Sequence, residues 1–109
     1  MPNLTLAECQ SCVGPGWESL IEEIYNILPA DAYITQVKEK FGTLRFYVYG
    51  VSMKVSTKIQ EVELRSGDVC EQCGEPGELR NFDGWYMTRC DKCAGTRKFD
   101  IGNTTACKP

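Results

Sequence analysis

With 109 residues, 42% of them hydrophobic, and a formal net charge of −3, the chain has the composition of a folded protein and not of a disordered one. This length accommodates one domain, or one small core with a metal-stabilised extension. The acidic balance argues against general binding to nucleic acid or to an anionic membrane, because both depend on a basic surface. The sequence has no histidine, which excludes histidine-dependent catalytic triads and the usual three-ligand hydrolytic zinc site.

No apolar run is long enough to span a bilayer, and the first residues lack the basic and apolar regions of an export signal. Seven cysteines would suit a secreted disulfide scaffold, but that interpretation needs export and usually an even count. We therefore expect a reducing cytoplasm, no membrane contact, and thiolates that bind a metal.

The first element predicted along the chain is an amphipathic helix over 17–28. Apolar residues recur there at helical spacing from Trp17 to Leu28, with polar residues on the opposite side, and Pro29 ends the pattern. The preceding residues, 1–15, show no clear periodicity and are predicted to form an irregular lead-in.

Two strands joined by a hairpin are predicted next, over 32–40 and 43–49, because both are rich in β-forming residues and Gly42 suits the turn between them. In the first strand, the two expected faces consist of Tyr33, Thr35 and Val37 against Ile34, Gln36 and Lys38. In the second strand, the expected apolar face consists of Leu44, Phe46 and Val48. The helix over 17–28 is expected to cover that apolar face.

A second helix is predicted over 52–66, where three apolar residues lie at helical spacing. After a break at 67–68, a second hairpin is predicted with strands 78–82 and 85–89. Its turn at 83–84 is an Asp-Gly pair, one of the strongest hairpin signals.

Four cysteines in two Cys-x-x-Cys pairs flank this second hairpin: Cys70, Cys73, Cys90 and Cys93. Sixteen residues separate the pairs, a spacing typical of a zinc site because each pair presents two thiolates from one tight turn. Four thiolates around Zn²⁺ close a tetrahedron and leave no open position for water. We therefore predict one structural zinc ion with these four ligands. An iron–sulfur cluster is the alternative, although two symmetric pairs on a hairpin favour zinc.

A third pair, Cys9 and Cys12, precedes the first helix, and Cys107 lies in the polar tail. Three interpretations stay open for them: unligated thiols, a second metal site completed by another ligand, or redox and disulfide chemistry. A redox pair normally follows a strand and begins a helix, where the positive environment lowers the thiol pKa. Here the charged neighbour is Glu8, so both thiols of the pair are predicted to have a normal or raised pKa.

Four blocks of the sequence follow one another in a characteristic order: Gly14-Pro15-Gly16-Trp17, the stretch 38–47, Cys70-x-x-Cys73-Gly74, and Gly84-Trp85 before Cys90-x-x-Cys93. Together they resemble a family of small uncharacterised proteins of bacteriophages and prophages. The resemblance covers residues 13–95 and implies a phage or prophage origin and action in a bacterial cytoplasm. It implies no activity, and Cys9, Cys12 and the tail lie outside it.

Two stretches combine basic residues with aromatic ones. The first hairpin carries Lys38, Lys40 and Arg45, which suit a phosphate or an acidic partner. The second stretch, 80–98, holds five basic and two acidic residues, and its candidate contact residues are Arg80, Trp85, Tyr86, Arg89 and Lys92. Ribbon modules hold single strands or bases with such residues. The alternative in both stretches is structural: solvated charges on the first hairpin, and aromatic cover for the metal site in the second.

These patterns predict an α+β fold in which a helix packs on a small antiparallel sheet, followed by a second helix and a zinc-ribbon or treble-clef-like module. The core is expected over 1–66 and the module over 67–109, packed as one unit because each is too small to bury a sizeable core alone. The predicted function is a non-enzymatic zinc protein of a phage or prophage that binds and modulates a host bacterial protein. The alternatives are a nucleic-acid-binding zinc ribbon, and a thiol-redox protein that uses Cys9 and Cys12.

Overall fold

The computed structural model describes residues 2–82 and 84–94. Over these residues it is an α+β structure with four α-helices and two small antiparallel sheets, and the predicted fold class is confirmed at that level. The elements, with two short 3₁₀ turns labelled η, are α1 (Leu6–Gln10), η1 (Pro15–Trp17), α2 (Glu18–Asn26), β1 (Tyr33–Lys40), β2 (Thr43–Tyr49), α3 (Met53–Arg65), η2 (Ser66–Asp68), β3 (Glu78–Phe82), β4 (Trp85–Arg89) and α4 (Asp91–Ala94).

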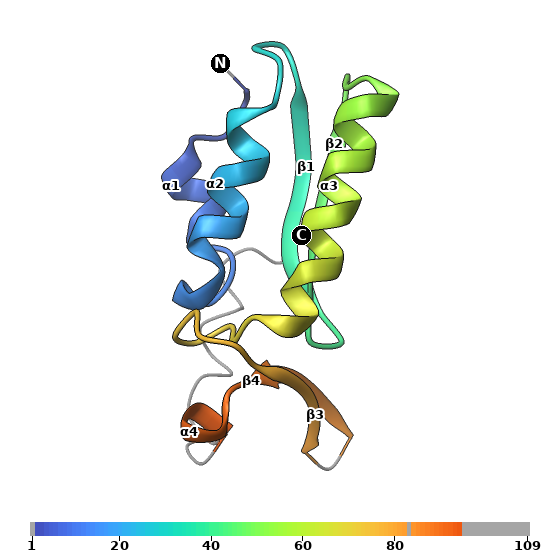
Figure 1. Ribbon diagram of the computed structural model, residues 1–109. Coiled ribbons are helices and arrows are strands. Elements are labelled where there is room, and N and C mark those ends of the chain that lie inside the picture. The colour runs from blue at the N-terminus through green and yellow to red at the C-terminus, as the bar shows by residue number, and fades with distance from the viewer. Residues whose placement is uncertain (1, 83, 95–109) are drawn as a thin grey trace.

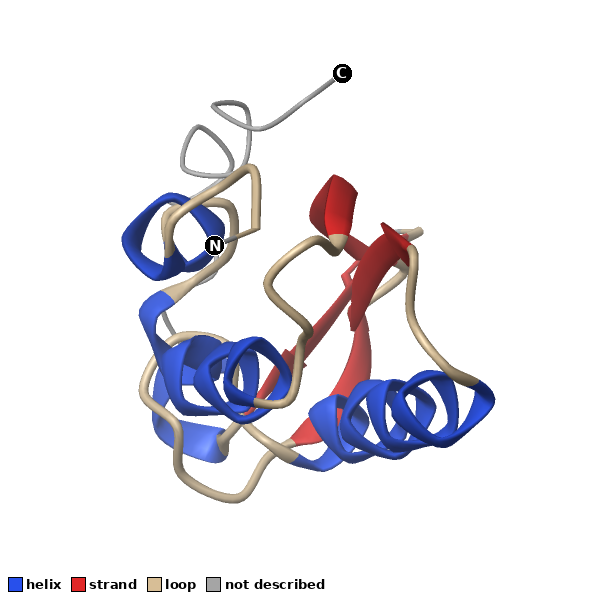
Figure 2. Ribbon diagram, turned by 90° about the horizontal axis from the view of Figure 1, so that it is seen from above, coloured by secondary structure: helices blue, strands red, loops and turns tan. Residues whose placement is uncertain are grey.

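Helices α2 and α3 lie side by side against the β1–β2 hairpin, and the β3–β4 hairpin lies at one end of this layer (Figure 1). Seen from above, both helices are on the same side of the two strands (Figure 2). The sequence predicted that one helix would cover this face. Helix α3 covers it as well, because its apolar residues Ile59 and Val62 belong to the same buried cluster.

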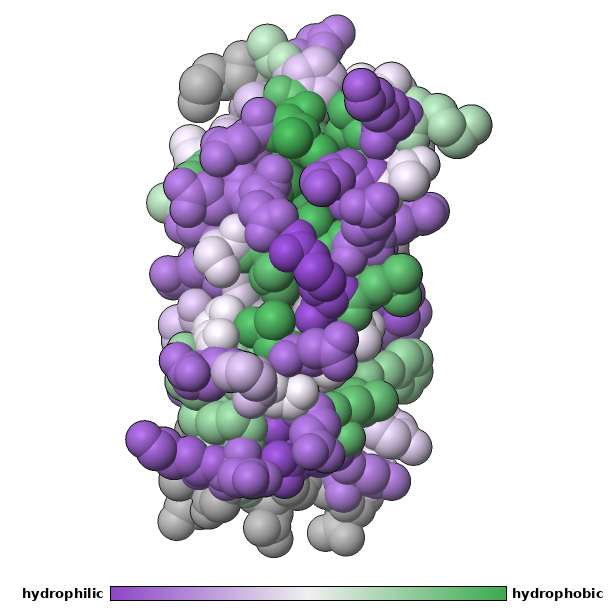
Figure 3. Space-filling model, viewed as in Figure 1, coloured by the Kyte–Doolittle hydropathy of each residue, from purple (hydrophilic) through white to green (hydrophobic). Residues whose placement is uncertain are grey.

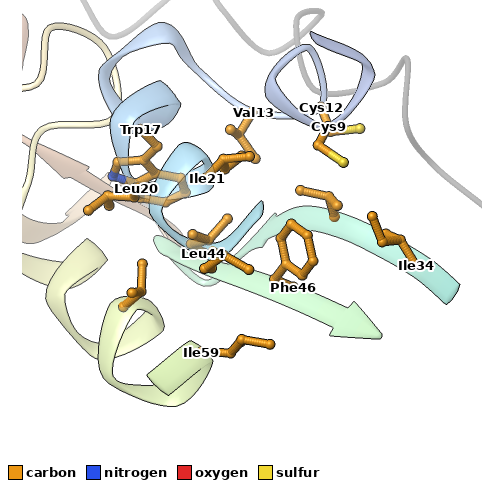
Figure 4. Packing of buried hydrophobic residues seen from close by; sticks show 13 residues of the cluster. Cys9, Cys12, Val13, Trp17, Leu20, Ile21, Ile34, Leu44, Phe46 and Ile59 are labelled. Atoms are coloured by element: carbon orange, nitrogen blue, oxygen red, sulfur yellow. The ribbon is translucent and has the colours of Figure 1, made fainter. Parts of the chain in front are cut away.

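The core lies between these helices and the inner face of the hairpin (Figure 4). Trp17, Ile21 and Leu44 are fully buried, and Phe46 packs in the same cluster. The apolar face predicted for β2 is confirmed, since Leu44 and Phe46 are buried and Val48 is half-buried. Each such side chain stabilises the fold by about 1.5–3 kcal/mol relative to exposure.

The prediction that residues 1–15 are irregular is wrong over α1. The Thr5 hydroxyl accepts a hydrogen bond from the backbone N–H of Glu8 (3.1 Å), and the Glu8 carboxylate accepts one from the N–H of Thr5 (2.8 Å). This reciprocal capping box satisfies two N–H groups that a helix start leaves without partners. The helix is too short for periodicity to reveal it, but the Thr-x-x-Glu spacing was visible in the sequence.

The strict alternation predicted for β1 is also wrong. A β-bulge between Ile34 and Gln36 places one extra residue opposite β2, so that Ile34 and Val37 both face the core and are 2% exposed. Alternation put these two residues on opposite faces because it has no place for an extra residue. Tyr33 stays on the outer face, where it lies opposite Tyr49.

The segment before α2 packs tightly against the first cysteine pair. The backbone N–H of Gly16 donates to the carbonyl of Glu71 (2.9 Å), and the indole N–H of Trp17 donates to the carbonyl of Val69 (2.8 Å). A Cβ atom on Gly16 would lie 2.0 Å from the carbonyl oxygen of Cys70, so only glycine permits this approach.

Candidate metal centre

Each Cys-x-x-Cys pair lies in a tight turn that backbone hydrogen bonds fix. In the first turn, the N–H of Cys70 donates to the carbonyl of Glu75 (2.8 Å), and the N–H of Gly74 donates to the carbonyl of Cys70 (2.9 Å). Gly74 has a φ of 85°, a left-handed conformation that glycine adopts without strain. In the second turn, Cys90 directly precedes α4, and its carbonyl accepts from the N–H of Ala94 (2.9 Å).

The β3–β4 hairpin brings these two turns together. Four sulfur atoms lie within 4.8 Å of one another, those of Cys70, Cys73, Cys90 and Cys93. The Sγ atoms of Cys73 and Cys90 are 3.6 Å apart. Sulfurs bound to one tetrahedral zinc ion at about 2.3 Å would lie about 3.8 Å apart, so the cluster has nearly the size that a single ion requires. These four residues therefore form a group that is able to hold a metal ion.

Backbone N–H groups favour the thiolate, the form that binds metals, at two of the four cysteines, Cys70 and Cys90, whereas burial and then the neighbouring sulfurs raise the pKa of Cys93 to about 12, and the pKa of Cys73 is also raised. The N–H of Cys93 points at the sulfur of Cys90, 3.4 Å away, and this contact is the main reason that the pKa of Cys90 is lowered to about 7. Cys70 is fully buried, which raises its pKa, but backbone N–H groups that point at its sulfur, that of Cys90 first, lower the pKa overall. The chemistry of the donor set thus fits a thiophilic metal.

Two arginines predicted as surface cations lie close to the second cysteine pair. Arg89 is 0% exposed, so its predicted role in a nucleic-acid surface is wrong. Its Nη1 lies 3.5 Å from the carbonyl oxygen of Cys93. Arg80 donates from Nε to the carbonyl of Arg89 (2.9 Å) and from Nη2 to the carboxylate of Asp91 (2.8 Å). These guanidinium groups support the turn around the cysteines, and the sequence could not show this because burial depends on the tertiary fold.

The other candidate residues of the second stretch remain at the surface. Trp85 and Tyr86 are about half exposed, and Lys92 is exposed. Arg97 and Lys98, which contributed to the predicted basic charge, lie outside the described residues, as does Asp83 of the turn. Among the described residues, the second hairpin therefore presents these aromatic side chains while Arg89 is buried and Arg80 is half-buried and paired with Asp91.

The first hairpin keeps all three of its predicted basic residues accessible. Lys40 is exposed, and Lys38 and Arg45 are half-buried. Phe41, in the turn between the strands, makes an edge-on contact with Tyr86, with ring centroids 6.4 Å apart. The two surfaces that the sequence suggested separately are therefore adjacent, and Phe41 of the stretch 38–47 lies where they meet.

Glu71, inside the first cysteine pair, is a buried carboxyl group that was also missed. Its carboxylate accepts from the N–H of Thr88 (3.0 Å), and its own N–H donates to the carbonyl of Thr88 (2.9 Å). Burial is the main reason that the pKa of Glu71 is raised to about 7, with a smaller contribution from Glu39. The Thr88 hydroxyl donates to the carbonyl of Gly42 (2.6 Å), so this pair joins the first cysteine turn to the β1–β2 turn.

Cys9 lies in the last turn of α1 and Cys12 follows the helix, whereas a redox pair normally begins a helix. Cys9 is a free thiol that is fully buried in the core, so it forms no disulfide with Cys12. Burial, and secondarily the charge of Glu8, raises the pKa of Cys9 to about 11, which confirms the expected direction. Cys107 lies outside the described residues.

Comparisons with protein-family models, with curated proteins and with solved structures found no match to this chain. The resemblance to phage proteins therefore stays a prediction. Over the part of the chain that the structure describes, no helix combines the length and the apolar character needed to cross a bilayer.

Proposed function

We propose that Cys70, Cys73, Cys90 and Cys93 hold one structural zinc ion, and that the chain is a non-enzymatic protein of a phage or prophage that binds a host protein in the bacterial cytoplasm. The observation that carries the first part is the convergence of four sulfurs within 4.8 Å. When bound, the ion would cross-link the two turns. A site closed by four thiolates offers no position for a substrate, so its contribution is to folding.

The protein-binding part is supported by a groove between α2 and α3. Figure 3 shows apolar side chains exposed in a strip between these helices, with polar side chains on either side. The groove has a volume of about 600 Å³, with Ile27 and Val55 among its lining residues and Lys54, Lys58 and Glu61 along α3. Apolar grooves with charged borders are typical of sites where proteins bind peptides or helices.

The metal is tested by elemental analysis of the purified protein, which should give one zinc ion per chain. Cys73→Ser should abolish the metal, whereas Cys9→Ser, which changes a cysteine outside the cluster, should retain it. An iron–sulfur cluster would instead give iron, sulfide and visible absorption. A metal-free protein in which β3 and β4 remain ordered would contradict the proposal.

The partner is tested by affinity capture from a nuclease-treated bacterial lysate. A specific host protein should be retained, and Thr57→Arg, which places a long charged side chain at the groove on an exposed position, should reduce its capture. Thr35→Arg makes the same change at an exposed position of β1 that does not line this groove, and it should leave capture unchanged. Capture of no specific protein, or equal loss with both variants, would argue against this function.

A further inference from the structure

The outer face of the β1–β2 hairpin carries aromatic side chains that no helix of the described residues covers. Both long helices lie on the inner face (Figure 2). The three tyrosines of this outer face, with their exposed fractions, are Tyr33 (58%), Tyr47 (38%) and Tyr49 (71%). Tyr33 and Tyr49 lie directly opposite each other across the strands, so their side chains are neighbours. Single exposed apolar side chains are common, but a contiguous group of them marks a site of interaction.

The turn of the same hairpin adds a fourth ring in an unusual conformation. Phe41 is 64% exposed and has a φ of 54°, in the left-handed region that bulky residues avoid and that glycine or asparagine would adopt readily. Such outliers concentrate at functional sites. Its edge-on contact with Tyr86, itself 40% exposed, extends the aromatic surface from the first hairpin onto the cysteine-bearing one.

Cations accompany the rings. The Nζ of Lys38 lies 5.7 Å from the ring centroid of Tyr47, and the Nζ of Lys40 lies 5.8 Å from that of Phe41. Arg45 lies opposite Lys38 on the neighbouring strand. No carboxylate from either strand competes on this face.

The one acidic residue in the two strands is turned away from these cations. It is Glu39, which lies opposite Leu44 on the buried side and accepts a hydrogen bond from the N–H of Gly42 (2.6 Å). The two lysines therefore meet no carboxylate from the strands, whereas the charge of Arg45 acts on Glu63 of α3, beside the edge of β2.

We propose that this aromatic face, made by Tyr33, Lys38, Phe41, Tyr47, Tyr49 and Tyr86, binds single-stranded nucleic acid. Bases stack on the exposed rings, and the backbone phosphates pair with the lysines and with Arg45. Exposed aromatics on a sheet face, with helices packed behind it, are a recurrent way to bind single strands, because every base offers a face for stacking. This site differs from the basic stretch predicted from the sequence, since it does not use Arg80 or Arg89.

An acidic protein surface is the competing occupant, and two features disfavour it. Lysine is depleted in protein–protein interfaces, whereas here Lys38 and Lys40 each lie beside an aromatic ring. A duplex fits less well than a single strand, because its base faces are stacked on one another and cannot reach the tyrosines. The proposal goes beyond the protein-binding function above, which uses the opposite side of the sheet.

The test is fluorescence anisotropy of the zinc-loaded full chain with labelled dT and rU oligonucleotides of about 20 nucleotides and a duplex of the same length. Both single strands should bind, more tightly than the duplex, and the dT and rU arms show whether DNA or RNA is preferred. Raising salt from about 50 to about 200 mM should weaken binding with a log–log slope of about −2, since three cations each release about 0.7 counterion from a single strand.

Substitutions test whether the aromatic face is the binding site. Tyr47→Ala and Phe41→Asn should each weaken binding by roughly 5- to 150-fold through lost stacking, and asparagine suits the left-handed backbone of the turn. Lys38→Ala should make the salt slope shallower. The matched controls lie on α3: Met53→Ala removes an apolar side chain that is 83% exposed, and Lys54→Ala removes the same charge, so both should bind normally.

Three outcomes would overturn the proposal. The first is flat titrations with both single strands at low salt. The second is binding that the control variants weaken as much as the variants of the aromatic face. The third is a captured acidic protein that depends on Tyr47 and Phe41 while no oligonucleotide binds, which would assign the face to a protein partner. The groove variant Thr57→Arg should leave oligonucleotide binding intact, so failure of the two proposals can be told apart.

Discussion

At Gly16 the backbone of the N-terminal segment passes directly over the first cysteine turn. A Cβ atom there would lie 2.0 Å from the carbonyl oxygen of Cys70 and 2.6 Å from the backbone nitrogen of Gly74. Both are main-chain atoms of the turn that positions Cys70 and Cys73, so neither can move without disturbing the metal ligands. Gly16→Ala should therefore lower the free energy of unfolding of the zinc-loaded protein by about 1–3 kcal/mol, measured by urea titration.

Gly67→Ala is the matched control for this prediction. Its new Cβ would meet only Thr43 Cγ2, at the ordinary distance of 3.9 Å. The free energy of unfolding should stay within about 0.5 kcal/mol of the original or rise slightly, because alanine restricts the unfolded chain more than glycine does. Equal destabilisation by both substitutions would contradict the argument from close approach.

Single residues also mark the limit of prediction from this sequence. The four cysteines of the cluster were found because their chemistry depends on spacing along the chain, which the sequence displays directly. Arg89 was predicted to be a surface cation because it lies in a stretch where basic and aromatic residues alternate, yet it is fully buried. Phe41 lay within the basic and aromatic stretch 38–47, but the sequence could not show its left-handed backbone or its contact with Tyr86, 45 residues further along.

At the level of elements, the outer edge of β2 depends on side chains of the following helix and turn. Strand β2 has one strand neighbour, so N–H groups along its other edge need partners. The N–H of Phe46 donates to the carboxylate of Glu63 (2.8 Å), and the N–H of Leu44 donates to the hydroxyl of Ser66 (2.8 Å). These contacts fix α3 along the strand and occupy two N–H groups that could otherwise pair with another chain.

Burial is the main reason that the pKa of Glu63 is raised above its usual value, and it outweighs the hydrogen bond from Phe46. When the pKa of a carboxyl group is higher in the folded state, the contribution of that group to the free energy of unfolding falls as pH rises from the unfolded pKa, about 4.3, through the folded pKa. Glu63→Gln keeps an acceptor for Phe46 but does not ionise. The free energy of unfolding of the original protein, minus that of the variant, should therefore fall as pH rises above the unfolded pKa of about 4.3, and it should level off once the folded carboxyl group has ionised.

The difference in free energy of unfolding between the original protein and Glu63→Gln is the quantity to follow, because acid also releases metal from the thiolates of both proteins. Denaturant titrations at several pH values, each with the two proteins in parallel, provide it. A difference that stays constant with pH would show that Glu63 titrates alike in the folded and unfolded states.

Elements with a clear period were predictable, and irregular ones were not. Helices α2 and α3 and all four strands were expected close to their observed bounds, because apolar spacing is a property of the sequence itself. Helix α1 depends on a capping box in five residues, and the bulge in β1 depends on how that strand meets β2. Both are local departures from regular spacing, so a search for periodicity passes over them.

At the scale of the whole molecule, the helices and first hairpin pack directly against the cysteine-bearing hairpin. Gly16 and Trp17 contact the backbone on either side of Cys70, and Thr88 donates to the carbonyl of Gly42 at the opposite side of the junction. The sequence suggested such packing only through the small size of each part. Which residues form the junction could not be predicted, because its hydrogen bonds join positions more than 40 residues apart.

Because of this junction, we expect metal removal to change the environment of core residues. Trp17 is fully buried, and its indole N–H donates to the carbonyl of Val69, the residue before Cys70. Because the binding energy of a structural zinc ion is also folding energy, a chelator should release the first cysteine turn and expose Trp17 to water. The chain has two tryptophans, so Trp85→Phe makes Trp17 the single tryptophan reporter. Its fluorescence should shift to longer wavelength with chelator and return when Zn²⁺ is added in excess.

Mg²⁺, which prefers oxygen ligands, should not restore the original emission of Trp17. An unchanged emission from protein shown to be metal-free would mean that the core folds independently of the cysteine cluster.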